Sequence, residues 1–266
     1  MIQAALQDSE EPASSRQTPF LSHSRISRYL LCPEQYRLYY IENLKPKLPA
    51  ASLVFGQAVH QALAVLFQSQ DDPVRFFMKL WEEVNQLDVD YSPKESWEKL
   101  RVTGQRLLDK FIHEQAQRLG KVQAAERVFE LNITCLDLPF VGVIDLVADL
   151  DGKKTVVDFK TAASSYEDHE VALSDQLTAY QLAEPDAEQT ALCVFVKTKA
   201  PRIEWHLAER TGAQLVEFLA KVDYVAREIA ARRFYKRPGR WCSWCDFLPV
   251  CLGDSQKVRE TLVQIR

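Results

Sequence analysis

The stretch GVIDLVADLDGKKTVVDFKT, residues 142–161, decides the fold, because two segments rich in β-branched residues flank a turn signal. The turn signal is Asp151-Gly152, a dipeptide that favours a two-residue hairpin and so sets the register of the two strands. If the residues that flank this turn pair with each other, Asp145 faces Asp158 with β-carbons about 5 Å apart. Like charges at that distance repel, so another group must compensate them.

A divalent cation between the two carboxylates would remove this repulsion, because Mg²⁺ and Mn²⁺ bind hard oxygen ligands. Lys160 follows Asp158 by two positions, and the two-residue period of a strand returns it to the same face. A lysine there can orient an attacking water or stabilise charge on phosphoryl oxygens. The alternative is a surface ion pair between Asp158 and Lys160, with Asp145 in solvent. Apolar neighbours on the same face favour the buried arrangement, and these are Val143, Val147 and Val156.

Hydrophobic periodicity divides the rest of the chain into helices, then strands, then a helix followed by more strands, which predicts an α/β sheet with helices on its faces. We expect a disordered tail at residues 1–20, because this segment is polar and has little to bury. The remainder, residues 21–266, is predicted to be one domain. It comprises a helical region at 52–120, a sheet core at 121–210, and a C-terminal helix with a cysteine cluster at 211–266.

The composition is that of an ordinary globular protein, with 266 residues, of which 47% are hydrophobic and 26% charged, and a net charge of -4. The chain has no uninterrupted apolar stretch of about 20 residues to cross a bilayer, and no signal-peptide pattern opens it. We therefore expect a cytoplasmic protein with no membrane partner. The net charge gives no overall attraction to nucleic acid, but residues 227–240 form a local basic run.

Six cysteines in a reducing compartment favour metal binding or catalysis over disulfides. Three of them fall in CSWCDFLPVC, residues 242–251, a spacing that suits either an iron–sulfur cluster or zinc if a fourth ligand joins them. Spacing alone does not separate these two occupants. Cys135 and Cys193 lie in strand patterns and are expected to be ordinary buried thiols.

Five motifs, taken together, resemble the RecB-like branch of the PD-(D/E)xK nuclease superfamily. G-x-I-D stands at residues 142–145 and D-F-K-T at residues 158–161. Gln176 and Tyr180 follow in DQLTAY, where a spacing of four places both on one helix face. Upstream, FGQAVH resembles the F-G-x-x-x-H helix of this branch, with His60 in the metal-binding position. A fifth pattern, at residues 22–36, concerns the cysteines.

The resemblance implies a restriction-endonuclease-like core, with a central mixed β-sheet flanked by helices and a helical insertion. The implied ligands of a Mg²⁺ or Mn²⁺ ion are His60, Asp145, Asp158 and the main-chain carbonyl of Phe159. An imidazole in the ligand shell suits Mn²⁺ better than Mg²⁺, so Mn²⁺ should support the stronger activity. Gln176 and Tyr180 would lie beside the site and hold the DNA strand or the lysine. The implied catalytic residues are Asp145, Asp158, Lys160, Gln176 and Tyr180.

The pattern S-x-S, then Tyr, then C-P-x-x-Y at residues 22–36 looks like the start of the members that carry an iron–sulfur cluster. These include CRISPR-associated spacer-acquisition exonucleases and helicase–nuclease subunits of bacterial break repair. The resemblance implies a 4Fe-4S cluster that clasps the two ends of the domain, with zinc as the alternative occupant. Its four ligands would be Cys32, Cys242, Cys245 and Cys251.

The implied function is metal-dependent hydrolysis of DNA by an exonuclease acting on single-stranded or frayed ends, in repair, recombination or CRISPR-type defence. The basic run at 227–240 would contact phosphates, and Phe234 and Tyr235 could stack on unpaired bases. Glu126, placed ahead of the first strand, is a further candidate acid. Because the chain has no G-x-x-x-x-G-K-[ST] loop, unwinding would need a partner such as a helicase, and a CRISPR integrase is another candidate partner. The alternatives are a catalytically inactive cluster- or zinc-bearing DNA-binding or assembly module, and a redox protein.

Overall fold

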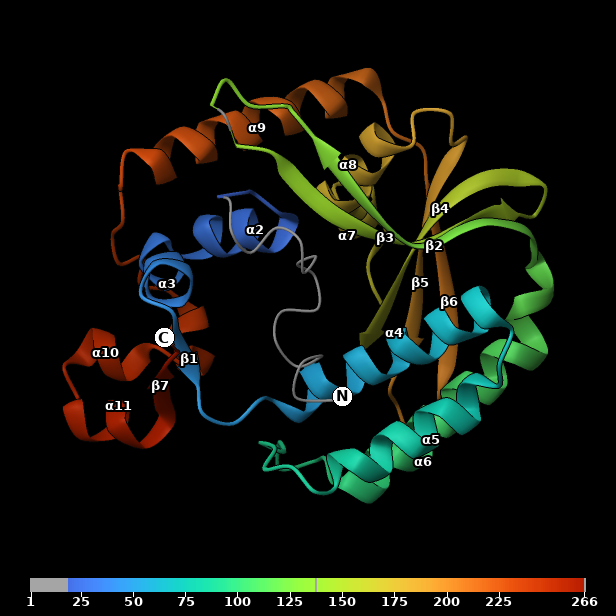
Figure 1. Cartoon of the computed structure of the whole chain (residues 1–266), viewed down its shortest axis with the longest axis horizontal. Helices are drawn as coiled ribbons and strands as arrows, with labels where there is room; N and C mark the ends of the chain where they lie inside the picture. The colour runs from blue at the N-terminus through green and yellow to red at the C-terminus, as the bar shows by residue number, and fades with distance from the viewer. Residues whose placement is uncertain (1–18, 137, 266) are drawn as a thin grey trace.

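The computed structural model describes residues 19–136 and 138–265, and its centre is a mixed five-stranded sheet with helices on both faces (Figure 1). The strands lie in the order β2-β3-β4-β5-β6, with β4 and β5 parallel and the other neighbours antiparallel. The arrangement confirms the predicted α/β sheet. The predicted tail, residues 1–20, falls almost wholly outside the described residues. The strands are β2 (Leu119–Leu131), β3 (Phe140–Leu150), β4 (Lys153–Ala162), β5 (Gln189–Val196) and β6 (Arg202–Ala208).

The hairpin of β3 and β4 has the predicted register. Its cross-strand pairs run from the residues that flank the turn to the pair Leu146↔Val157. The φ angles of Asp151 and Gly152 are 52° and 86°, so both turn residues occupy the left-handed region that a tight two-residue hairpin requires. Glycine takes that conformation without steric cost, and aspartate is one of the few other residues that tolerates it.

Three helices cover one face of the sheet, as the pattern of residues 52–120 predicts (Figure 1). Their buried side chains, among them Phe55, Phe77 and Trp81, form one core with the inward side chains of β3, β4 and β5. Among the described residues, α4 alone is long and apolar enough to cross a membrane by length and composition. Its buried face packs into this core, as an internal helix does. The elements here are α4 (Ala51–Ser69), α5 (Pro73–Val84), α6 (Trp97–Lys110), η3 (Phe111–Gln115) and η4 (Ala116–Arg118).

Helices from distant parts of the chain cover the other face and form a second core with it. The hydroxyl of Ser22 caps the first of them by accepting the Arg25 N–H at 3.3 Å. Ser174 and Thr211 cap two others in the same way. These helices are α2 (His23–Leu31), α7 (Asp168–Ala172), α8 (Asp175–Ala183) and α9 (Gly212–Ala230).

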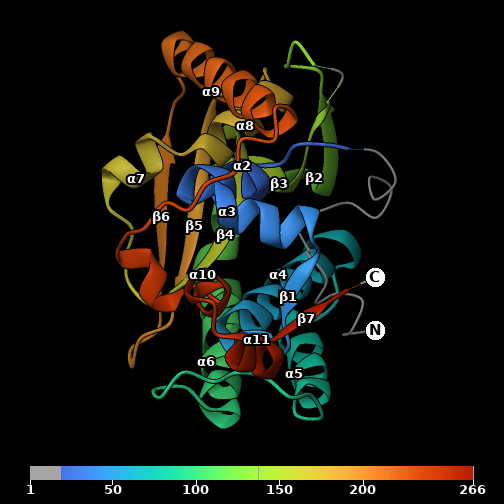
Figure 2. The same ribbon diagram turned by 90° about the vertical axis from the view of Figure 1, so that its left-hand side faces the viewer.

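The C-terminal segment lies against N-terminal elements of the described chain, where β1 and β7 are side by side (Figure 2). Strands β1 and β7 pair antiparallel, and the Tyr29 hydroxyl donates to the Arg233 carbonyl at 2.7 Å. The Glu34 N–H donates to the Tyr235 carbonyl at 3.0 Å. Hydrogen bonds of the protein itself therefore hold the C-terminal segment against the N-terminal one. The elements involved are α3 (Pro33–Tyr36), η2 (Arg37–Ile41), β1 (Leu44–Pro46), η5 (Arg240–Trp244), α10 (Leu248–Leu252), α11 (Ser255–Thr261) and β7 (Leu262–Gln264).

Candidate functional site

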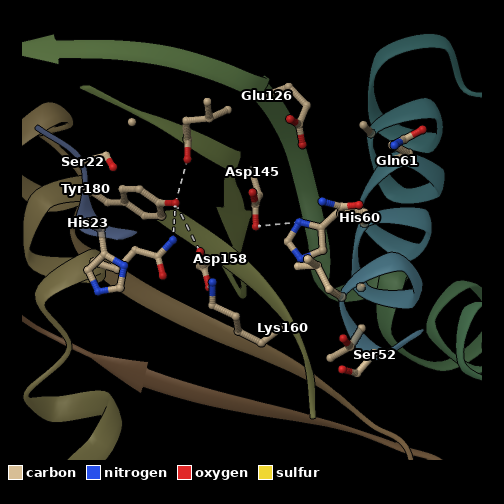
Figure 3. Close-up of a pocket in the computed structure, with 18 of the residues that line it drawn as sticks. Ser22, His23, Ser52, His60, Gln61, Glu126, Asp145, Asp158, Lys160 and Tyr180 are labelled. Atoms are coloured by element: carbon tan, nitrogen blue, oxygen red, sulfur yellow. Dashed lines mark hydrogen bonds and ion pairs between the residues drawn. The ribbon is translucent and has the colours of Figure 1, made fainter. Parts of the chain in front are cut away.

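A fork in the sheet creates the candidate site. Within the described residues, β3 and β4 form no pair beyond Leu146↔Val157; the rest of β3 pairs with β2, and β4 pairs with β5 from Thr155 onward. A cavity of about 740 Å³ opens at this fork, lined by the start of α2, by α4, by α8 and by the diverging strands (Figure 3). Asp145 and Asp158 both line it, one step past the last pair of the hairpin.

Asp145 connects the two strands and α4. Its side chain is 11% exposed, and Oδ2 accepts the Phe159 N–H at 2.7 Å and lies 3.6 Å from His60 Nδ1. Burial acts to raise the pKa of Asp145, but His60, the Lys160 charge and the Phe159 N–H outweigh it and hold the pKa below its ordinary value. Burial acts in turn to lower the pKa of His60, and Asp145 overcomes this and raises it. Figure 3 shows both side chains turned into the cavity.

Asp158 is the most buried acid of the site, with a side chain 1% exposed. Its Oδ2 lies 3.1 Å from Lys160 Nζ, an ion pair close enough for the ammonium to donate to it, and no second donor reaches that oxygen among the described residues. Burial raises the pKa of Asp158 to about 6; the Lys160 charge opposes this shift and the Asp145 charge adds to it. A buried carboxylate oxygen with one described partner still has capacity for a ligand.

Gln176 and Tyr180 share one face of α8, as predicted, and Gln176 contacts Tyr180, which in turn contacts Asp158. Gln176 Nε2 donates to the Tyr180 hydroxyl at 2.9 Å. That hydroxyl reaches the Val143 carbonyl at 2.7 Å and Asp158 Oδ1 at 3.2 Å. The Tyr180 hydroxyl thus links Asp158 to the β3 backbone, whereas the sequence led us to expect support for the lysine or the DNA strand.

Glu126 lies in the middle of β2 and not ahead of the first strand, which corrects its predicted position. Its neighbours on β2 pair with the residues on either side of Asp145, so Glu126 is level with Asp145 across the ladder. Its φ angle of 52° is rare for a residue other than glycine. Burial of the carboxyl, with the Asp145 charge, raises the pKa of Glu126 to about 7. Glu126 is therefore a third acid at the fork (Figure 3).

The donor set of the fork fits a hard divalent cation in its chemistry. Two carboxylates and one imidazole are ligands that Mg²⁺ and especially Mn²⁺ accept, and such an ion would give the buried Asp158 Oδ2 a second partner beside Lys160. Across the described ranges, no three His, Cys, Asp or Glu side chains are already gathered as a metal site. Lys160 and His60 lie against the carboxylates instead, so ligand binding requires side-chain adjustment. Ligation by the Phe159 carbonyl stays a prediction.

The four cysteines predicted to act together lie half-buried on the segments that join the two chain ends. Burial raises the pKa of Cys245, and Cys32 adds to this effect. Burial likewise raises the pKa of Cys251, with smaller contributions that include Cys245 and Cys32. Cys32 therefore lies near enough to affect both of the other thiols, but no three cysteines of the described residues are gathered as a metal site. Cys242 joins them through the main chain, where its carbonyl accepts the Cys245 N–H at 3.3 Å.

The other two cysteines behave differently from each other. Cys193 lies on β5 with no exposed surface, as predicted. Cys135 is exposed, so its expected burial is wrong. The strand that was expected to contain it ends at Leu131, and the Cys135 N–H instead donates to Asp223 on α9 at 2.9 Å.

Four cations of the basic run at 227–240 have partners within the protein, and the phosphate contact predicted for this run stays a prediction. Arg227 pairs with Asp223 at 2.8 Å, and Arg233 pairs with Glu228 at 2.6 Å. Two further cations donate to main-chain carbonyls near the chain ends: Lys236 to Cys251 and Arg237 to Leu30. Phe234 packs against Tyr36 with ring centroids 6.0 Å apart, so it is not free to stack on a base. Tyr235 is 59% exposed, so its ring is accessible for stacking on a base.

Comparison with known proteins places this geometry in context. A family model described as the PD-(D/E)XK nuclease superfamily matches residues 20–252. No curated protein matches the chain. A provisionally named exonuclease from Eubacterium rectale is 11% identical and has a TM-score of 0.56, with 84% of this chain and 87% of that chain covered. At that identity the likeness shows the fold alone. SSO0001 is 14% identical over 95% of this chain and 94% of its own, but its TM-score of 0.43 is too low to carry an argument.

Proposed function

Because the chain belongs to the PD-(D/E)XK nuclease superfamily, we propose that it is a nuclease that hydrolyses DNA phosphodiester bonds at the fork between β3 and β4. One observation carries the proposal: the buried Asp158 carboxylate, whose Oδ2 has Lys160 as its one described partner, opens into the same cavity as Asp145 and His60. An acid of that kind costs stability unless it serves a ligand. Family membership supports nuclease activity and a Mg²⁺ or Mn²⁺ ion, and DNA as the substrate is our extension.

Each side chain of the fork has a separate task in this proposal. His60, Asp145 and Asp158 would hold the divalent cation, which when bound supplies positive charge to polarise the phosphate. Lys160 orients the attacking water in line with the scissile bond and stabilises the charge that builds on the phosphoryl oxygens. Tyr180, held by Gln176, keeps the Asp158 carboxylate aimed into the cavity. The Phe159 N–H does the same for Asp145.

The shape of the site supports single-stranded or frayed DNA ends as substrate. The cavity is bounded by α2 and α8 on one side and by α4 on the other, so the reacting phosphate has to enter a recess (Figure 3). A single strand can bend into such a recess more readily than a duplex can. We extend the proposal accordingly to exonuclease action on unpaired ends.

Cleavage of labelled DNA by purified protein tests this function. The wild type should degrade linear single strands with Mg²⁺, and faster with Mn²⁺, and should be inactive in EDTA. Asp158→Ala and Lys160→Ala should each abolish cleavage, whereas Lys257→Ala, an exposed lysine on α11, should cleave normally. Circular single strands separate exonuclease from endonuclease action. Wild-type rates in both site variants, with their folding verified by thermal unfolding, would remove the assignment.

We further propose that the chain belongs to the RecB-like branch and that its four half-buried cysteines hold a 4Fe-4S cluster, with zinc as the alternative occupant. The contribution of Cys32 to the raised pKa of both Cys245 and Cys251 supports a shared site. Anaerobically purified protein should be brown and contain iron, and Cys32→Ser should lose both properties. Cys135→Ser is the matched control, because Cys135 is exposed elsewhere. A colourless, zinc-containing wild type would select the alternative.

The cellular setting follows as a proposal from the same resemblance. We place the protein in the cytoplasm, in DNA repair, recombination or CRISPR-type defence, with a helicase or a CRISPR integrase as partner. Purification of the tagged protein from its host, followed by identification of co-purifying proteins, tests this setting. Recovery of neither class of partner would argue against it.

A further inference from the structure

A second lysine lines the cavity at the end away from Tyr180. Lys197 directly follows β5, and its N–H donates to the Ala162 carbonyl on the neighbouring strand at 2.7 Å. The side chain is 9% exposed, with Nζ 5.2 Å from the centroid of the Phe55 ring. A nearly buried ammonium is costly unless it is paired, so its partner is informative.

The partner is Glu95, from the segment between α5 and α6. Glu95 Oε1 lies 3.4 Å from Lys197 Nζ, and Oε2 accepts the Ser92 hydroxyl at 2.9 Å. The Glu95 side chain is 21% exposed, and Ser92, Glu95 and Lys197 all line the same cavity as Asp158. A carboxylate that itself lines the cavity thus pairs with the ammonium.

The distance between the two lysines can be worked from the sheet. In the parallel pair of β4 and β5, Lys160 is level with Val194, so Lys197 lies three residues further along and one strand across. With a rise of about 3.3 Å per residue and a strand spacing of about 4.8 Å, the two backbones are about 11 Å apart. Because three is an odd step along a strand, Lys197 projects toward Phe55 and α4 whereas Lys160 projects to the face of Asp158, and both reach the cavity where β3 and β4 separate.

The cavity wall between the lysines has little side-chain bulk. Gly56 on α4 faces Thr161 on β4, and a β-carbon added at Gly56 would lie only 3.2 Å from the Thr161 hydroxyl. Gly56, Thr161 and both lysines line the cavity. A strand whose reacting phosphate lies at Lys160 could therefore continue along this wall to Lys197.

We propose that Lys197 binds a second phosphate of the DNA strand, one or two nucleotides from the bond that is cleaved, and that Glu95 occupies Lys197 until DNA displaces it. This inference rests on the proposed function. A carboxylate and a phosphate are both anionic acceptors for an ammonium, so they compete for it. Glu95 therefore weakens DNA binding, while it also prevents an unpaired buried charge in the free protein.

Binding of a fluorescent single-stranded oligonucleotide, measured by anisotropy in EDTA to prevent cleavage, tests this inference. Lys197→Met should weaken binding about tenfold uniformly across sequences and lower the salt slope by about 0.7. Glu95→Gln should instead tighten binding several-fold, because it removes the competing anion. Lys257→Met is the matched control and should bind as the wild type does. If Lys197→Met does not fold, Lys197→Gln replaces it.

The opposite signs of the two variants separate phosphate binding from a purely structural tether. If the Glu95–Lys197 pair only holds the loop in place, both variants lose stability, and their DNA affinities do not shift in opposite directions. Unchanged binding by the lysine variant, or weaker binding by Glu95→Gln, would overturn the inference. If the wild type cleaves DNA and the Lys197 variants bind DNA as the wild type does, this inference alone is refuted. A wild type that neither binds nor cleaves DNA refutes the proposed function itself.

Discussion

Replacing Asp158 with asparagine should make the protein more stable while it destroys the activity, because the buried carboxylate opposes folding. Asparagine keeps the shape of the side chain and an oxygen that can still accept the Tyr180 hydroxyl, which lies 3.2 Å from Oδ1. The change removes the charge alone. Lys160 loses its ion-pair partner, but its side chain is 27% exposed, so water can replace much of that interaction.

The magnitude follows from the pKa of Asp158, which burial raises from 3.8 to about 6. Below pH 3.8 the carboxyl is protonated in both states and contributes nothing. As the pH rises through the window from 3.8 to 6, the unfolded chain releases its proton first, so the folded state loses stability. At 1.36 kcal/mol per pKa unit, the loss reaches about 3 kcal/mol at pH 7. Asparagine does not titrate, so the variant escapes this loss.

Urea unfolding in EDTA at pH 4 and at pH 7 measures the effect. The free energy of unfolding of Asp158→Asn should exceed that of the wild type by about 3 kcal/mol at pH 7 and by less than 1 kcal/mol at pH 4. Cleavage of DNA by the variant should be absent at both values. A variant that is no more stable than the wild type at pH 7, or whose advantage is the same at both pH values, would refute the reasoning.

Three further changes test neighbouring parts of the account. Tyr180→Phe leaves the Val143 carbonyl without its hydroxyl donor and Asp158 without support, so cleavage should fall 10–100-fold, and undiminished cleavage would contradict this. Gly152→Ala at φ 86° should lower the free energy of urea unfolding by about 1 kcal/mol with cleavage unchanged; no loss would argue against the left-handed turn. His60→Ala should weaken Mn²⁺ binding in calorimetry, and unaltered affinity would exclude the imidazole as a ligand.

The hairpin shows what the sequence alone can predict. The Asp151-Gly152 dipeptide predicts both the turn and the register, because a two-residue loop leaves the flanking strands only one way to pair. Helix capping is similarly local, since a capping hydroxyl acts on its own helix, as those of Ser22, Ser174 and Thr211 do. What the register did not reveal is that β3 and β4 separate at the acids, so that Asp145 accepts the Phe159 N–H.

The misplaced predictions share a physical cause, which is dependence on contacts distant in sequence. The position of Glu126 opposite Asp145 depends on the pairing of β2 with β3. The long connection after Leu131 does not fix that register, so it could not be predicted from the sequence. The sequence of the basic run does not show that Lys236 and Arg237 donate to the main-chain carbonyls of Cys251 and Leu30. Periodicity likewise extended the strand past its true end and assigned Cys135 to the core.

Calorimetric titration of Mn²⁺ into the wild type and into Asp158→Asn, both freed of metal, tests most directly whether the fork of the sheet exists to hold a divalent ion. The account predicts a saturable site in the wild type that requires Asp158 and is lost in the variant. Equal affinity and stoichiometry in the two proteins would contradict it.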